Sequence, residues 1–83
     1  MNRSGLIAAL DAAHVSASSY WLDGGLPSER YCIEKRTSGW AVYYSERGQR
    51  TGETLFEEED EACGEIYRML LADPTTRIGL LGK

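Results

Sequence analysis

The stretch from residue 31 to residue 56, YCIEKRTSGWAVYYSERGQRTGETLF, decides the fold. Side chains alternate between two faces in residues 31–35 and again in residues 40–45, which is the pattern of β-strands. Residues 50–56 predict a third strand that is polar except for its end, as suits the edge of a sheet. The short segments between these strands each contain a glycine, which predicts tight hairpins and therefore antiparallel pairing.

An amphipathic helix is predicted on each side of the strands. In residues 3–14, apolar side chains recur on one stripe of a helix. Residues 57–72 have a broader apolar stripe, and Asp73-Pro74 ends that helix. The predicted fold class is α+β in the order α-β-β-β-α, with a three-stranded antiparallel sheet and two helices packed on one face. We expect a single α+β domain at 1–73 and a C-terminal tail at 74–83 that either frays or folds back on the sheet.

The central strand carries a tyrosine on each face. Tyr44 shares a face with Trp40 and Val42, whereas Tyr43 points to the opposite side. We therefore expect one face to pack on the helices and the other to expose aromatic area.

Charge is distributed unevenly along the chain. The formal net charge is −4, but residues 51–73 alone carry eight acidic side chains and one basic side chain, Arg68. Five of these acids form an unbroken run, Glu57–Glu61, at the start of the second predicted helix, where backbone N–H groups favour anions. One or two acids suffice for that purpose, so the run also predicts an acidic surface suited to a basic partner.

The sequence contains no catalytic set, and we expect neither an enzyme nor a cofactor or metal. His14 is the only histidine, which leaves a His-based triad or metal site without partners. The acidic run is contiguous in a predicted helix, so its side chains radiate instead of converging on a cation. Cys32 and Cys63 lack CxxC spacing, and buried, reduced thiols in a cytoplasmic protein are expected; one disulfide from a strand to the last helix is the alternative. No signal peptide or membrane span is predicted.

The α-β-β-β-α order is also that of double-stranded-RNA-binding domains, which this chain resembles in topology only. Such domains bring basic side chains from the start of the last helix onto phosphates, where this chain has Glu57–Glu61. A nucleic-acid-binding or regulatory module is therefore the alternative function. It would have to use the basic residues Arg30, Lys35, Arg36, Arg47 and Arg50.

Residues 20–70 resemble a group of small bacterial proteins encoded beside polymorphic or contact-dependent toxins. The resemblance lies in Gly24–Pro27, in Tyr31–Lys35, in Trp40–Gly48 with its YYSERG hexamer, and in Phe56–Cys63. It implies an immunity protein that neutralises a cognate toxin by covering a basic active-site or substrate cleft. The residues expected to bind that partner are Tyr43, Tyr44, Glu46, Arg47, Glu53, Glu57, Glu58, Glu59, Asp60 and Glu61. A hairpin with one core ring, one surface ring and a solvated turn is the structural alternative for Tyr43–Gly48.

Overall fold

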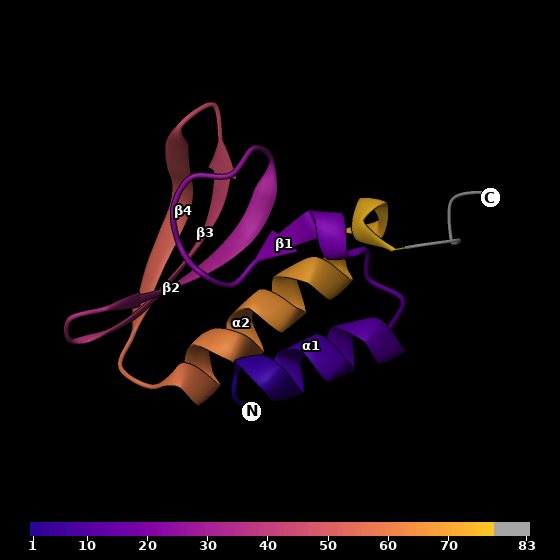
Figure 1. Cartoon of the computed structure of the whole chain (residues 1–83), viewed down its shortest axis with the longest axis horizontal. Helices are drawn as coiled ribbons and strands as arrows, with labels where there is room; N and C mark the ends of the chain where they lie inside the picture. The colour runs from indigo at the N-terminus through magenta and orange to yellow at the C-terminus, as the bar shows by residue number, and fades with distance from the viewer. Residues whose placement is uncertain (78–83) are drawn as a thin grey trace.

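A four-stranded mixed sheet forms one layer of the molecule, and two helices cover one of its faces (Figure 1). The structure is a computed structural model that describes residues 1–77 of the 83. In spatial order, the strands are β1 (Tyr20–Trp21), β2 (Arg30–Arg36), β3 (Gly39–Glu46) and β4 (Gln49–Phe56). The helices are α1 (Arg3–Ala12) and α2 (Glu59–Ala72), and the 3₁₀ turns are η1 (Ala17–Ser19) and η2 (Pro74–Thr76).

The general α+β class is as predicted, but the three-stranded antiparallel sheet is wrong. β2, β3 and β4 pair antiparallel through tight hairpins, whereas β1 adds a fourth strand parallel to β2. β1 has only two residues, too few for an alternating pattern to be visible in the sequence.

The parallel pairing forces the loop between β1 and β2 across the sheet. Two parallel strands begin at the same end of the sheet. The chain must therefore return from the end of β1 to that end of the sheet before β2 can begin. It does so over the face opposite the helices, where the Tyr43 hydroxyl donates to the Gly25 carbonyl at 2.7 Å. Gly24 lies against the side chain of Glu34 on the same face, so closely that a Cβ at this position would overlap it.

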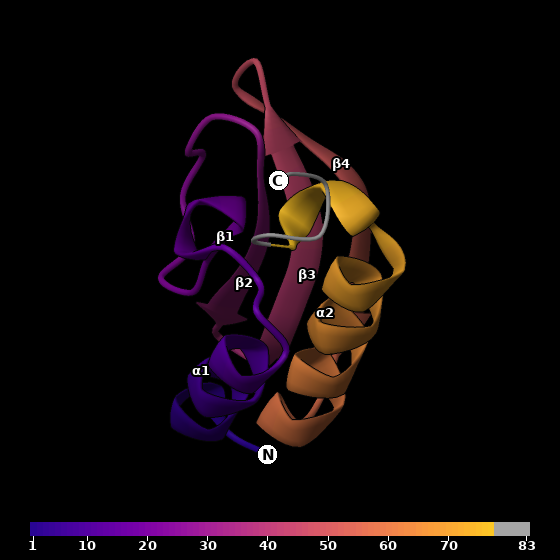
Figure 2. The same cartoon turned by 90° about the vertical axis from the view of Figure 1, so that its right-hand side faces the viewer.

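The two helices lie side by side and run in the same direction, with their N-termini adjacent (Figure 2). α1 begins after Asn2, the N-cap, whose side chain accepts from the Gly5 N–H. It ends before His14, which adopts a left-handed backbone with φ of 62°. α2 begins at Glu59 because Glu58 has the extended backbone of an N-cap, two residues later than predicted.

The main core lies between the helices and the sheet. It contains most of the residues predicted for the helical stripes, together with Ile33, Trp40 and Val42 from the sheet. Its buried members are Leu6, Leu10, Val15, Leu22, Ile33, Trp40, Val42, Ala62, Cys63, Ile66 and Leu70.

A second, smaller core lies on the opposite face of the sheet. Cys32, Ala41 and Tyr43 are fully buried there. The prediction that this face exposes aromatic area is therefore wrong, because the β1–β2 loop covers it. The two cysteines are free and belong to different cores, on opposite faces of the sheet, so they are not joined by a disulfide.

Residues 74–77 of the predicted tail pack on the domain. Thr76 is buried, and its hydroxyl donates to the Leu70 carbonyl at 2.8 Å. The Thr76 carbonyl accepts from the Ser16 N–H, and Arg77 forms a β-bridge with Val15. The rest of the tail lies outside the described residues.

Candidate protein-docking surface

The structure distributes the predicted partner-binding residues over three places. Tyr43 is fully buried under the β1–β2 loop, and Tyr44 is half-buried on the helix face, where its ring meets Tyr31 edge-on at 4.9 Å. Glu46 and Arg47 form the tip of the β3–β4 hairpin. The acidic run follows the far end of β4, about 25 Å away along the strand. These residues therefore do not form one continuous surface.

Part of the acidic run serves the fold. The Glu59 carboxylate accepts from the backbone N–H of Arg3, in the first turn of α1, at 2.9 Å. The Glu61 carboxylate accepts from the Glu58 N–H at 3.3 Å, at the start of α2. Two helix N-termini lie side by side here, and their combined positive partial charge explains why this sequence places several acids together.

Two further acids make ionic contacts. Asp60 pairs with the α-amino group of Met1. Glu53 pairs with Arg36 across the exposed face of β4 at 2.5 Å. Within residues 1–77, the exposed Glu57 carboxylate has neither a salt bridge nor a hydrogen bond, and it lies closest in sequence to β4.

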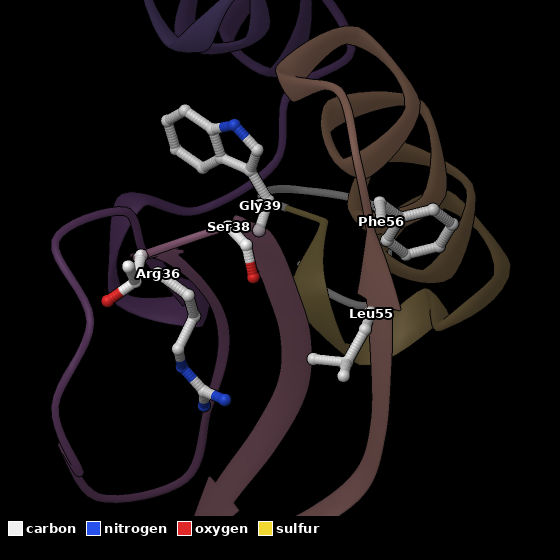
Figure 3. A pocket seen from close by; sticks show the side chains of 7 residues that line it. Arg36, Ser38, Gly39, Leu55 and Phe56 are labelled. Atoms are coloured by element: carbon white, nitrogen blue, oxygen red, sulfur yellow. The ribbon is translucent and has the colours of Figure 1, made fainter.

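An apolar pocket adjoins Glu57. It lies at the end of the sheet, has a volume of about 330 Å³, and is lined by Arg36, Thr37, Ser38, Gly39, Trp40, Leu55 and Phe56. Figure 3 shows Leu55 and Phe56 on β4 at one side of the view, Arg36 at the other, and Ser38 and Gly39 between them. Leu55 is 68% exposed, the most exposed of the large hydrophobic side chains described.

The backbone of Gly39 forms the floor of this pocket. A Cβ at position 39 would overlap the Phe56 carbonyl oxygen and lie 3.5 Å from the Glu57 Cα. Gly39 therefore allows β3 to approach the end of β4 closely. The same close approach places the backbone of Glu57 next to Gly39.

Two cations flank Trp40, which closes the pocket. The Arg3 guanidinium carbon lies 5.1 Å and the Lys35 ammonium nitrogen 4.9 Å from the centre of a Trp40 ring. Such contacts stabilise the ring position by roughly 0.5–1 kcal/mol each at exposed sites. The two contacts restrain the Trp40 ring in the pocket wall. A restrained wall lowers the entropy cost of binding a partner's side chain.

We name the Leu55–Glu58 segment together with Gly39 and Trp40 the β4-end surface. Of these residues, only Glu57 and Glu58 were predicted from the sequence to bind a partner; Leu55, Phe56, Gly39 and Trp40 were not. The available signal was two consecutive large apolar residues at the end of an otherwise polar strand, directly before the acids. Nothing in the sequence says that β3 and β4 leave a hollow there.

The basic residues of the nucleic-acid alternative are mostly engaged within the protein. Arg36 contacts Glu34 and Glu53, and Arg50 lies 3.6 Å from Glu34. Arg50 also stacks over the Tyr43 ring, Arg30 over Trp21, and Lys35 over Trp40. These side chains do not converge on one phosphate-binding groove.

Among residues 1–77, no three His, Cys, Asp or Glu side chains are placed to hold a metal ion together. The helices in that part of the chain are too short or too polar to cross a bilayer. Comparisons with protein-family models, with curated proteins and with solved structures find no match to this chain.

Proposed function

We propose that this chain is a small acidic protein-binding module that captures a basic protein through the β4-end surface. The observation that carries the proposal is the apolar pocket lined by Leu55 and Phe56, with the exposed residue Glu57 directly after them in the chain. Interfaces combine an apolar anchor in a pocket with a charged rim that selects the partner and speeds association. The acidic rim selects for lysine and arginine side chains around an apolar anchor.

The partner we propose is a bacterial toxin domain, which makes the chain an immunity protein. Support comes from the resemblance of residues 20–70 to the immunity-type group and from the eight acids in residues 51–73. Toxins that act on nucleic acid or nucleotides carry basic clefts, to which an acidic surface is complementary. By covering such a cleft, this chain would keep the toxin's substrate out through binding alone, without catalysing a reaction.

The pocket sets the scale of the contact. At about 330 Å³ it lies at the lower end of small-molecule sites, so it fits one large side chain of a partner and not an extended ligand. The remaining contact area has to come from β4, whose residues 49–55 are all exposed. An edge strand of this kind also offers backbone groups to a partner.

The experiment is co-expression with the proteins encoded beside this chain, followed by co-purification at low and high salt. The proposal expects one neighbour to co-purify in a stoichiometric complex that weakens as salt rises. It also expects growth inhibition by that neighbour to be relieved by this chain. If none of them binds or inhibits growth, the immunity proposal is wrong. A complex with DNA or RNA instead would favour the nucleic-acid alternative.

A further inference from the structure

A second, polar cavity lies at the opposite end of α2 from the β4-end surface. Its volume is about 210 Å³, and its lining comes from η1, the β1–β2 loop, β2, β3, and Asp73 and η2 just after α2. α2 is 14 residues long, so the two sites are separated by about 20 Å along the helix. Neither site shares a residue with the other, and this cavity plays no part in the proposed function.

Two carboxylates and several hydroxyls line this cavity, and no lysine or arginine does. The carboxylates are Glu29 and Asp73, and the tyrosines are Tyr31 and Tyr44. Arg77, the next basic residue along the chain, turns instead to the Leu71 carbonyl at 3.0 Å. The cavity therefore has uncompensated negative charge among the described residues.

Asp73 is ionised and fixed in place. Its Oδ2 accepts from the Tyr31 hydroxyl at 2.9 Å, and its Oδ1 accepts from the backbone and hydroxyl of Thr75. The hydrogen bond from the Thr75 hydroxyl, with that from Tyr31, lowers the pKa of Asp73. A carboxylate has about four acceptor positions, so one remains on Oδ2 after these three bonds.

Two other lining groups also offer free acceptor positions, the exposed Glu29 carboxylate and the Tyr44 hydroxyl, which can also donate. Within residues 1–77, the Glu29 carboxylate and the Tyr44 hydroxyl have no hydrogen-bond partner. Burial raises the pKa of Tyr44, and the nearby negative charges of Glu29, Glu46 and Asp73 raise it further. The C-terminal end of α2 adds the negative end of the helix dipole.

We propose that this cavity binds a guanidinium group. Guanidinium is planar, has five N–H donors and no acceptor, and stacks on aromatic rings. These properties complement two carboxylates, free hydroxyls and the Tyr31–Tyr44 pair. A cavity of 210 Å³ is below the size of drug-like sites, so it takes a single head group. The source is either an arginine side chain of a partner or a small free guanidine.

The test is an NMR titration of the whole chain with n-propylguanidine, using n-propylurea as the uncharged analogue of the same shape. The proposal expects saturable, millimolar binding with shifts centred on the amides of Ser19, Thr75 and Thr76. It expects n-propylurea to bind at least about tenfold more weakly. Equal binding of the two compounds, or shifts centred elsewhere, would overturn it.

Variants make the test specific. Glu29→Gln removes one charge without breaking a hydrogen bond or ion pair within residues 1–77, and it should weaken n-propylguanidine binding by about tenfold. Asp11→Asn removes a charge from the exposed face of α1 and should leave binding within about twofold, as should Glu57→Gln. Undiminished binding by Glu29→Gln would contradict the proposal.

A third arm separates the two sources. Acetyl-Gly-Arg-Gly-amide presents the same head group on a peptide backbone. Tighter binding of this peptide than of n-propylguanidine assigns the cavity to a partner's arginine, and weaker binding assigns it to a free guanidine. Both outcomes support guanidinium recognition.

Discussion

Tyr43 and Tyr44 are neighbours in the sequence with opposite fates in the structure. Alternation along the strand places them on opposite faces, and both readings of the sequence assumed that one ring would be exposed. Tyr43 is fully buried and donates a hydrogen bond to Gly25 in the β1–β2 loop. This bond ties the loop to the sheet and explains why the far face is closed.

Replacing Tyr43 by phenylalanine should therefore destabilise the protein. The Gly25 carbonyl would lose its donor, at a cost of about 1 kcal/mol in the free energy of unfolding. Urea denaturation measures this cost. Tyr20→Phe is the control, because Tyr20 is partly exposed and its hydroxyl has no partner among residues 1–77; it should change stability by less than about 0.5 kcal/mol. An equal effect of both substitutions would show that the bond contributes nothing specific.

Both cysteines should be inert in the folded protein. They are free and fully buried, and burial raises the pKa of both thiols, that of Cys32 to about 11. The thiolate is the reactive form, so both factors slow the reaction. A chromogenic disulfide reagent at pH 7.5 should react with two thiols per chain in denaturant. Under native conditions it should react with less than about 0.2 thiols per chain within minutes. Rapid native labelling of either cysteine would contradict its placement in a core.

At the scale of the elements, the acidic run has two different roles. Glu59 joins the N-termini of α1 and α2 through its bond to the Arg3 N–H and an ion pair with the Arg3 side chain at 3.6 Å. Glu59→Gln should lower the free energy of unfolding by about 0.5–1 kcal/mol, with less effect in high salt. Glu57→Gln also removes one charge, but from an acid without a partner among residues 1–77. It should change the free energy of unfolding by less than about 0.5 kcal/mol. Equal losses would mean that Glu57 is structural as well, which would weaken its assignment to a docking surface.

The hydrogen bond from the Tyr31 hydroxyl on β2 to Asp73, just after α2, should be lost at alkaline pH. Burial, together with the hydrogen bond to Asp73, raises the pKa of Tyr31 from 10.0 to about 12. The folded state therefore holds this proton more tightly than the unfolded state. This stabilisation is complete below pH 10 and is lost as pH rises towards 12.

Denaturant unfolding at a series of pH values tests this expectation. Stability should begin to fall above pH 9 through Cys32 and Cys63, and fall more steeply between pH 10 and 12, where Tyr31 contributes together with Tyr43 and Tyr44. Tyr31→Phe should make the second part smaller and keep the first. A wild-type curve that is flat up to pH 12 would contradict both assignments.

The sequence predicted those elements whose residues carry a strong local period. The three long strands and both helices are present, with limits that differ by one or two residues at most ends. The two misplaced helix ends have local causes: Glu58 is the N-cap of α2, and the left-handed His14 follows the end of α1. β1 was missed because its pairing with Tyr31 and Cys32 is a tertiary contact with no local pattern.

At the scale of the whole molecule, the candidate surface could be predicted only in part. Its charge was visible in Glu57–Glu61, but two of these acids, Glu59 and Glu61, bind backbone N–H groups at the helix N-termini, and Asp60 pairs with the α-amino group of Met1. Its apolar part depends on the close approach of Gly39 to Phe56, residues far apart in sequence. The predicted hairpin residues Glu46 and Arg47 lie at the other end of β4, and their part in binding stays a prediction.

The central claim is that a basic protein binds at the β4-end surface, and calorimetry with the partner identified by co-purification tests it most directly. Leu55→Thr should weaken binding at least tenfold, since it removes the exposed apolar anchor, and Glu57→Gln should weaken it about threefold, more at low salt than at high salt. Ile7→Thr and Asp11→Asn are the matched controls on the exposed face of α1 and should leave the dissociation constant within about twofold. If the controls weaken binding and Leu55→Thr does not, the partner binds elsewhere and the claim is wrong.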